Sequence, residues 1–175
     1  MEIITLGGGC FWCTETIFKR IKGVIDVNSG YCGGQTINPS YESICTGETG
    51  HAEVIQISYN PNDVSLETLL GVFFDTHDPT TLNRQGADVG TQYRSAIFYS
   101  TEEQKRIAEM MIEELTRSSV FPKPIVTEIT ELNTFYKAEN YHQNYYENNK
   151  NQAYCHLVIN PKLDKFLKKY KTITE

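Results

Sequence analysis

Apolar and polar residues alternate along several short stretches of the chain, which is the pattern of strands that bury one face. The alternation is clearest over residues 51–59, where one face is formed by Glu53, Ile55, Ile57 and Tyr59. Shorter or less regular stretches of the same kind predict further strands, at residues 2–8, 24–31, 93–99 and 125–131. The fold is therefore expected to contain a sheet.

Helices are predicted at three stretches between these strands, at residues 10–21, 66–77 and 102–117. In the first two, apolar residues recur every three or four positions and would form a buried face. Ser65 and Thr101 directly precede the second and third stretches as N-caps, and Gln104 stands at the capping-box position. A basic helix or turn is expected over residues 161–170.

The predicted elements begin in the order strand, helix, strand, strand, helix, strand, which matches the split βαβ arrangement of ferredoxin-like folds. We therefore expect an α+β two-layer sandwich, with helices on one face of a mixed, largely antiparallel sheet. A single domain is expected over residues 1–175, with a core at about 1–135 and a long irregular C-terminal segment at about 136–175. The start of this segment is rich in Tyr, Asn and His and is expected to cover a functional site. Two glycine-rich loops interrupt the core, and long loops in a small domain are usually functional.

Composition and charge narrow the class of protein. The 175 residues carry a net charge of −6, which argues against a nucleic-acid binder because phosphates are bound by basic surfaces. No apolar run approaches the ~20 residues of a membrane-spanning helix, and no secretory signal is visible. Five cysteines are an odd number that does not suggest a secreted disulfide framework. A monomer in the reducing cytoplasm is the expectation.

Two cysteines, Cys10 and Cys13, follow three consecutive glycines and bracket Phe11 and Trp12. A cysteine at the N-terminus of a helix is favoured as a thiolate, which makes Cys10 a candidate nucleophile. The spacing also fits a general CxxC dithiol–disulfide oxidoreductase. A non-enzymatic metal-binding module is a further alternative, although the other cysteines stand singly and zinc prefers four ligands at matched spacings. Cys13 is equally explained as a small core residue.

The residues around these cysteines suggest a ligand with sulfur chemistry. Consecutive helical residues point in different directions, so if Phe11 faces the core, Trp12 points elsewhere, over the cysteine. Aromatic rings attract sulfur-containing groups such as a methyl thioether. Glu53 shares a strand face with two isoleucines, and it is either an edge residue that reaches solvent or a buried carboxyl with a raised pKa that could donate a proton.

Seven short motifs occur along the chain in the order typical of one enzyme family. They are Gly9-Cys10-Phe11-Trp12, Ser29-Gly30-Tyr31 with Gly33-Gly34, Asn38-Pro39-Ser40-Tyr41, Thr49-Gly50-His51-Ala52-Glu53, His77-Asp78-Pro79-Thr80, Gly90-Thr91-Gln92-Tyr93-Arg94-Ser95 and Tyr141-His142-Gln143. Through these motifs the sequence strongly resembles the A-type peptide methionine sulfoxide reductases. The resemblance spans most of the chain and implies a catalytic domain that reduces methionine-S-sulfoxide, free or in proteins.

The resemblance also implies a role for each site residue. Cys10 would attack the sulfoxide sulfur, and Glu53 would supply a proton to the sulfoxide oxygen. Tyr41 and Tyr93 would donate hydrogen bonds to that oxygen, which agrees with the chemistry because neutral acids and phenols stabilise it without competing as nucleophiles. Asp88 would orient this polar network.

Phe11 and Trp12 would hold the substrate methyl group. After methionine leaves, Cys10 remains as a sulfenic acid, which requires a second thiol. Cys155 resembles the C-terminal resolving cysteine of many members, and Cys13 could resolve the sulfenic acid or form a second disulfide. Thioredoxin or another dithiol would then reduce the enzyme, with no bound metal or organic cofactor. Cys32 and Cys45 are expected to be buried structural thiols.

Overall fold

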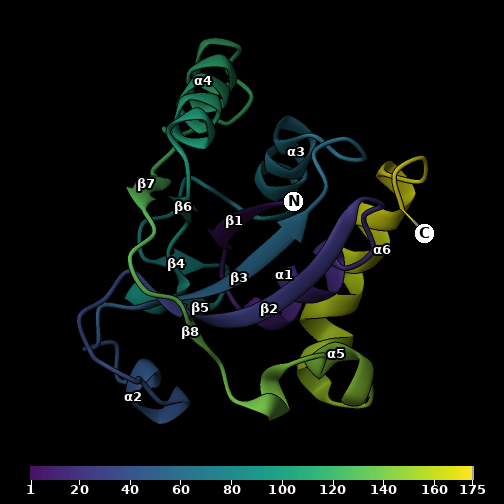
Figure 1. Cartoon of the computed structure of the whole chain (residues 1–175). Coiled ribbons are helices and arrows are strands. Elements are labelled where there is room, and N and C mark those ends of the chain that lie inside the picture. Colours follow the sequence, from purple (N-terminus) through teal and green to yellow (C-terminus); the bar gives the residue numbers. More distant parts are fainter. Residues whose placement is uncertain (175) are drawn as a thin grey trace.

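Six strands form the main sheet of the computed structural model, which describes residues 1–174 (Figure 1). They are β1 (Glu2–Gly7), β2 (Val24–Cys32), β3 (Ala52–Tyr59), β6 (Ala96–Tyr99), β7 (Glu128–Glu131) and β8 (Tyr136–Lys137). The order across the sheet is β7-β6-β1-β3-β2-β8. The β6–β7 pair is parallel and all the other pairs are antiparallel, so the sheet is mixed. A separate small hairpin is formed by β4 (Arg84–Gln85) and β5 (Asp88–Val89).

Six α-helices accompany the sheet within residues 1–174, which makes the fold a mixed α/β structure. They are α1 (Phe11–Phe18), α2 (Tyr41–Cys45), α3 (Leu66–Thr76), α4 (Glu102–Arg117), α5 (Tyr145–Asn148) and α6 (Asn160–Lys169). A π-helical turn, Cys155–Ile159, leads directly into α6. Within the same residues, no helix is both long enough and apolar enough to cross a membrane.

The central strand β3 buries one face fully and only part of the other, which agrees with its alternating sequence pattern. The face formed by Glu53, Ile55, Ile57 and Tyr59 lies in the main core, which α1 and α3 close with their apolar side chains. On the opposite face, Ala52 and Val54 belong to a smaller apolar cluster, against which Phe135 of the C-terminal segment packs. The segment after β7 thus completes the fold.

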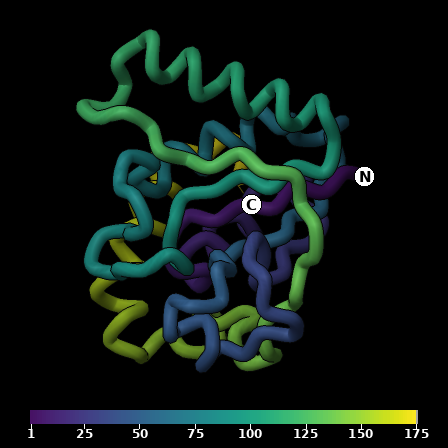
Figure 2. The backbone as a smooth tube through the Cα atoms, turned by 90° about the vertical axis from the view of Figure 1, so that its left-hand side faces the viewer, coloured from purple at the N-terminus to yellow at the C-terminus, as the bar shows by residue number. Residues whose placement is uncertain are grey.

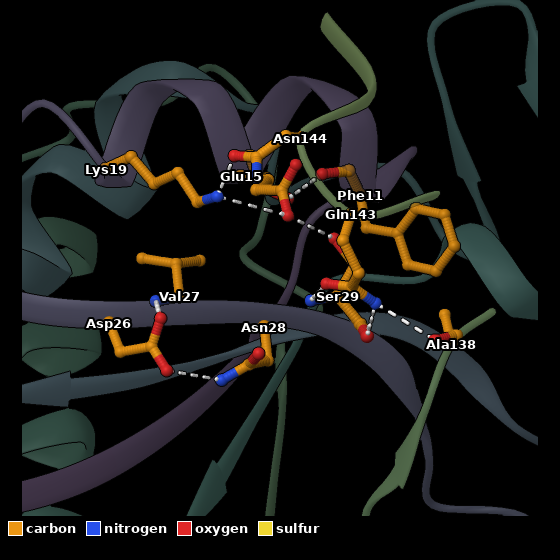
Figure 3. Close-up of polar contacts among 11 residues, drawn as sticks. Phe11, Glu15, Lys19, Asp26, Val27, Asn28, Ser29, Ala138, Gln143 and Asn144 are labelled. Atoms are coloured by element: carbon orange, nitrogen blue, oxygen red, sulfur yellow. Dashed lines mark hydrogen bonds and ion pairs between the residues drawn. The ribbon is translucent and has the colours of Figure 1, made fainter. Parts of the chain in front are cut away.

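The C-terminal segment is attached to the sheet by β8 and by side chains beyond it, among them Gln143. The amide of Gln143 pairs with the edge of β2, since its Oε1 accepts a hydrogen bond from the Ser29 N–H and its Nε2 donates one to the Ser29 carbonyl, each at 3.0 Å (Figure 3). Beside it, the buried carboxyl of Glu15 on α1 accepts a hydrogen bond from the Ser29 hydroxyl. The segment is therefore fixed next to α1, and α5 and α6 follow it there in Figure 1.

Most of the predicted elements are confirmed, and the differences lie at their ends. The predicted helix 10–21 ends at Phe18, and the predicted strand 93–99 starts only at Ala96 because residues 91–93 form a 3₁₀ turn. The predicted strand 125–131 starts at Glu128, since the Val126 N–H bonds to the Pro79 carbonyl instead of to a strand. Figure 2 shows this segment after α4 running back alongside β6.

The N-caps of α3 and α4 are confirmed, but the expected capping box of α4 is wrong. Ser65 and Thr101 accept hydrogen bonds from the backbone N–H groups three residues later. The Gln104 side chain, however, accepts from the Ser100 N–H and donates to the Ile3 carbonyl. The Gln104 amide therefore bonds to Ile3 near the start of β1 rather than to the cap residue, and it joins α4 to the sheet.

Candidate active site

Cys10 stands at the junction between β1 and α1, as the sequence predicts. It is the N-cap residue of α1 and has an extended backbone, with φ −64° and ψ 126°. Gly9 before it has φ +90°, and a Cβ atom there would lie 2.7 Å from the Gln85 side chain, so only glycine fits this turn. The turn directs the Cys10 side chain into the space between α1 and the C-terminal segment.

Three of the five cysteines meet at this position. Cys10, Cys13 and Cys155 pack together with Ile159 in one buried cluster, and none of them is in a disulfide. Cys10 is 9% exposed, and the Cys10 and Cys13 thiols are hydrogen-bonded to each other. The structure thus brings both candidate resolving cysteines to the candidate nucleophile.

Burial opposes the thiolate that the helix N-terminus favours at Cys10. Burial raises the pKa of the Cys10 thiol well above its usual value, and the hydrogen bond to Cys13 and the nearby Glu53 raise it further. The Trp12 backbone N–H lowers this pKa, but one amide does not offset the loss of water around the sulfur. The same hydrogen bond lowers the pKa of Cys13, so the protonation of one thiol depends on that of the other.

Of the two interpretations of Glu53, the structure supports the buried carboxyl. Its side chain is 2% exposed on β3, opposite Tyr31 of β2, and its Oε1 accepts a hydrogen bond from the Phe11 N–H at 3.2 Å. Burial raises the pKa of Glu53 to about 8, the Phe11 N–H opposes this shift, and the charge of Asp88 adds to it. The carboxyl therefore holds its proton at neutral pH next to the first turn of α1.

Tyr41 and Tyr93 reach this carboxyl from two different loops. Tyr41 is the first residue of α2, and Tyr93 ends the 3₁₀ turn before β6. Burial raises the pKa of both phenols, and each is raised further by the proximity of Glu53. Both hydroxyl groups therefore stay protonated and are available as hydrogen-bond donors beside the acid.

Asp88 lies at the edge of the same group of residues, on β5. Its carboxylate accepts a hydrogen bond from the Tyr154 hydroxyl at 2.9 Å. Its negative charge raises the pKa values of Glu53 and Tyr93, so it is close to both. Asp88 thereby connects the polar residues of the core to the C-terminal segment.

Phe11 and Trp12 point in different directions, as expected for consecutive helical residues. Phe11 is fully buried against Tyr31, with the ring centroids 5.6 Å apart. Trp12 is half-buried and points toward the C-terminal segment, where its indole N–H donates to His142 Nδ1 at 3.0 Å. Its ring stacks on Tyr145 at a centroid distance of 3.7 Å. The aromatic wall of the site is therefore shared between α1 and the C-terminal segment.

Comparison with known proteins identifies the family of this chain. A family model described as peptide methionine sulfoxide reductase matches residues 2–174. The chain belongs to this family. Peptide methionine sulfoxide reductase MsrA of Sulfolobus acidocaldarius is 56% identical to it over 170 residues, which are 97% of this chain and 96% of the relative.

Two solved structures are similar over most of this methionine sulfoxide reductase. Reduced Mxr1 from Saccharomyces cerevisiae has a TM-score of 0.78 and 38% identity, with 88% of each chain covered. Mxr1 in complex with Trx2 has a TM-score of 0.55 and 30% identity, with 82% of this chain and 84% of that chain covered. Through its family, the chain is an enzyme that reduces methionine sulfoxide to methionine.

Several residues of this reductase site were not assigned from the sequence. His142, Tyr145 and Tyr154 surround Trp12, although the sequence only indicated that their segment covers the site. The density of tyrosine and histidine after residue 135 was the available signal. The spacing of residues along the sequence cannot reveal such contacts, since His142 and Trp12 are 130 positions apart.

The remaining cysteines of the reductase lie away from the thiol cluster. Cys32 is buried in the apolar cluster on the far face of the sheet, as expected. Cys45 is exposed, so its assignment as a buried structural thiol is wrong. It lies at the end of α2, a short helix in which only Ile44 is fully buried. Among residues 1–174, no group of three or more His, Cys, Asp or Glu residues is placed to hold a metal ion.

Proposed function

We propose that this methionine sulfoxide reductase acts on the S epimer, free or in proteins, through attack of Cys10 on the sulfoxide sulfur. The observation that carries the proposal is the carboxyl of Glu53, which is buried and hydrogen-bonded to the Phe11 N–H, next to the turn that carries Cys10. A sulfoxide sulfur becomes a good electrophile only when its oxygen is protonated or strongly hydrogen-bonded. Glu53 is the acid that this oxygen requires.

The first half of the reaction leaves the oxygen on the enzyme. The Cys10 sulfur forms a bond to the sulfoxide sulfur as Glu53 gives its proton to the oxygen. The oxygen then passes to Cys10, the bond between the two sulfurs breaks, and methionine leaves. Cys10 becomes a sulfenic acid, and the proton lost by its thiol restores Glu53, so that atoms and charge balance.

The other site residues act on the bound substrate. Tyr41 and Tyr93 donate hydrogen bonds to the sulfoxide oxygen, and their protonated state beside Glu53 suits this role. Phe11 and Trp12 hold the methyl group between α1 and the C-terminal segment. Asp88 orients the polar network through Tyr154.

A second thiol completes the cycle. Cys155 attacks the sulfenic acid, forms a disulfide with Cys10 and releases water. Cys13 passes the disulfide on by thiol exchange, and thioredoxin or another dithiol reduces it. The common cluster of the three cysteines and the placement of Cys155 in a π-helical turn support this order, since such turns are local irregularities that are frequent at functional sites. The structure of Mxr1 with Trx2 supports thioredoxin as the reductant.

Replacing Cys155 with serine is expected to spare the first turnover and block recycling. The variant should form about one methionine per enzyme without reductant, because Cys10 and Glu53 are intact, while its turnover with thioredoxin should fall at least ~100-fold. Methionine release quantified in both regimes checks this. Cys32→Ala, on the far face of the sheet, is the matched control. If Cys155→Ser recycles normally and Cys13→Ser does not, Cys13 is the resolving cysteine.

The reaction class itself predicts a choice between epimers. With dithiothreitol as reductant, the S epimer of methionine sulfoxide should be reduced and the R epimer should react at least ~100-fold more slowly. When Phe11 and Trp12 hold the methyl group, the sulfoxide oxygens of the two epimers point in different directions. One fixed set of hydrogen-bond donors can therefore reach the oxygen of only one epimer. Chromatographic separation of the two remaining epimers measures the ratio. Equal consumption of both epimers, or of neither, contradicts the proposed function.

We further propose a ferredoxin-like core and a single catalytic domain. Four neighbouring strands in the order β6-β1-β3-β2, all antiparallel and linked by α1 and α3, support the split βαβ arrangement. The contacts of His142 and Tyr145 with Trp12 support a C-terminal segment that covers the site.

We also propose that the protein is a monomer in the cytoplasm. The five unpaired cysteines support the cytoplasm, since a reducing compartment keeps thiols free.

A further inference from the structure

One carboxylate outside the proposed machinery connects three parts of the molecule. Glu139, in the C-terminal segment, accepts a hydrogen bond from the Tyr41 backbone N–H through Oε2 at 2.9 Å. Its Oε1 accepts a second one from the Tyr31 hydroxyl at 3.0 Å. Tyr31 is fully buried in β2, whereas Tyr41 begins α2. The helix that carries a site tyrosine is thus tied to the sheet through Glu139.

The tie matters because it fixes the backbone at the start of α2, while the Tyr41 ring packs on His142 with the ring centroids 4.4 Å apart. The helix is five residues long, lies in the loop between β2 and β3, and buries only Ile44. The Ser40 hydroxyl caps the Ser43 N–H, which leaves the Tyr41 N–H to Glu139. The bonds from the Tyr41 N–H and the Tyr31 hydroxyl lower the pKa of Glu139 despite its partial burial, so both are charge-assisted.

The other end of the tie reaches the strand pair that carries the acid. Tyr31 stands opposite Glu53 in the register of β2 and β3, and its ring contacts Phe11. A chain of contacts therefore leads from Glu53 through Tyr31 and Glu139 to the backbone of Tyr41. The spacing between the carboxyl and the Tyr41 phenol depends on this chain rather than on the loop alone.

We propose that Glu139 is a positioning residue that sets where the Tyr41 hydroxyl meets the sulfoxide oxygen. The inference rests on the proposed function, in which Tyr41 donates a hydrogen bond to that oxygen. Hydrogen-bond donors stabilise a developing charge only when they are held in place before the reaction, and small displacements of such groups are costly. Glu139 acts on the chemistry only through Tyr41.

A double-mutant cycle tests this dependence. Glu139→Ala removes both acceptor oxygens, so neither the Tyr31 hydroxyl nor the Tyr41 N–H keeps its partner, and kcat should fall about tenfold with KM little changed. In a Tyr41→Phe background the same replacement should have almost no further effect, since no hydroxyl remains to be positioned. In a Tyr93→Phe background it should again lower kcat about tenfold. Glu42 is an exposed glutamate on α2, next to Tyr41. Its replacement, Glu42→Ala, is the matched control and should leave kcat unchanged.

The outcomes separate the inference from the function beneath it. A tenfold loss that is repeated in the Tyr41→Phe background would show that Glu139 acts only through general stability, and the inference would be wrong. Full activity of Tyr41→Phe would overturn the role of Tyr41 and, with it, that of Glu139. Thermal unfolding of each variant gives the stability change separately, and it should be the same in both phenylalanine backgrounds.

Discussion

Serine in place of Cys10 is expected to abolish methionine sulfoxide reduction, with a loss of at least ~10³-fold in kcat. The variant keeps the size of the side chain and the turn set by Gly9, so the fold should be preserved. A hydroxyl at this position is a far weaker nucleophile than a thiol. The oxygen of the substrate then has no acceptor, because the reaction requires a sulfur that can become a sulfenic acid.

Methionine formed from the S epimer with dithiothreitol measures this effect. Dithiothreitol removes the need for a resolving cysteine, so the assay reports the first step alone. Cys32→Ala should retain activity, because that thiol lies in the cluster on the other face of the sheet. If Cys10→Ser keeps more than about 1% of the activity while Cys13→Ser loses it, Cys13 is the nucleophile and the proposed order of the thiols is wrong.

The positions of Cys10 and Glu53 could be predicted because local sequence determines them. Three glycines followed by a helical pattern define the turn before α1, and strict alternation over residues 51–59 places Glu53 on the buried face. Both features need only a few neighbouring residues and the periodicity of one element. The same holds for the caps at Ser65 and Thr101.

The protonation state of Cys10 could not be predicted in this way. A helix N-terminus favours a thiolate only while water or many donors surround the sulfur, and here the site is closed by Tyr145 and Tyr154 from far along the chain. The exposure of Cys45 and the late start of β7 have the same origin. Each depends on contacts between a loop and a part of the backbone far away in the sequence, such as the hydrogen bond from the Val126 N–H to the Pro79 carbonyl.

Glutamine in place of Glu53 is expected to lower kcat at pH 7 by roughly 10²- to 10⁴-fold, the range typical of a lost general acid. The amide has nearly the same shape and can still accept the hydrogen bond from the Phe11 N–H. It cannot give a proton to the sulfoxide oxygen. Tyr41 and Tyr93 remain as donors, so a measurable residual rate should survive, in contrast to Cys10→Ser. A rate within threefold of the wild type would contradict the role of Glu53.

The free energy of unfolding gives an independent measure of the Glu53 proton. The native pKa of about 8 exceeds the unfolded value of about 4.3, so between these pH values the native state holds a proton that the unfolded state has lost. Stability contributed by this group is present below about pH 4.3 and is lost as the pH rises through about 8, by up to ~1.4 kcal/mol per pH unit. Glu53→Gln has no such slope. Its stability relative to the wild type, measured by denaturant unfolding from pH 5 to 9, should rise until about pH 8 and then level off. A constant difference over this range would mean that Glu53 is ionised in the native protein, and the acid of the proposed reaction would be lost.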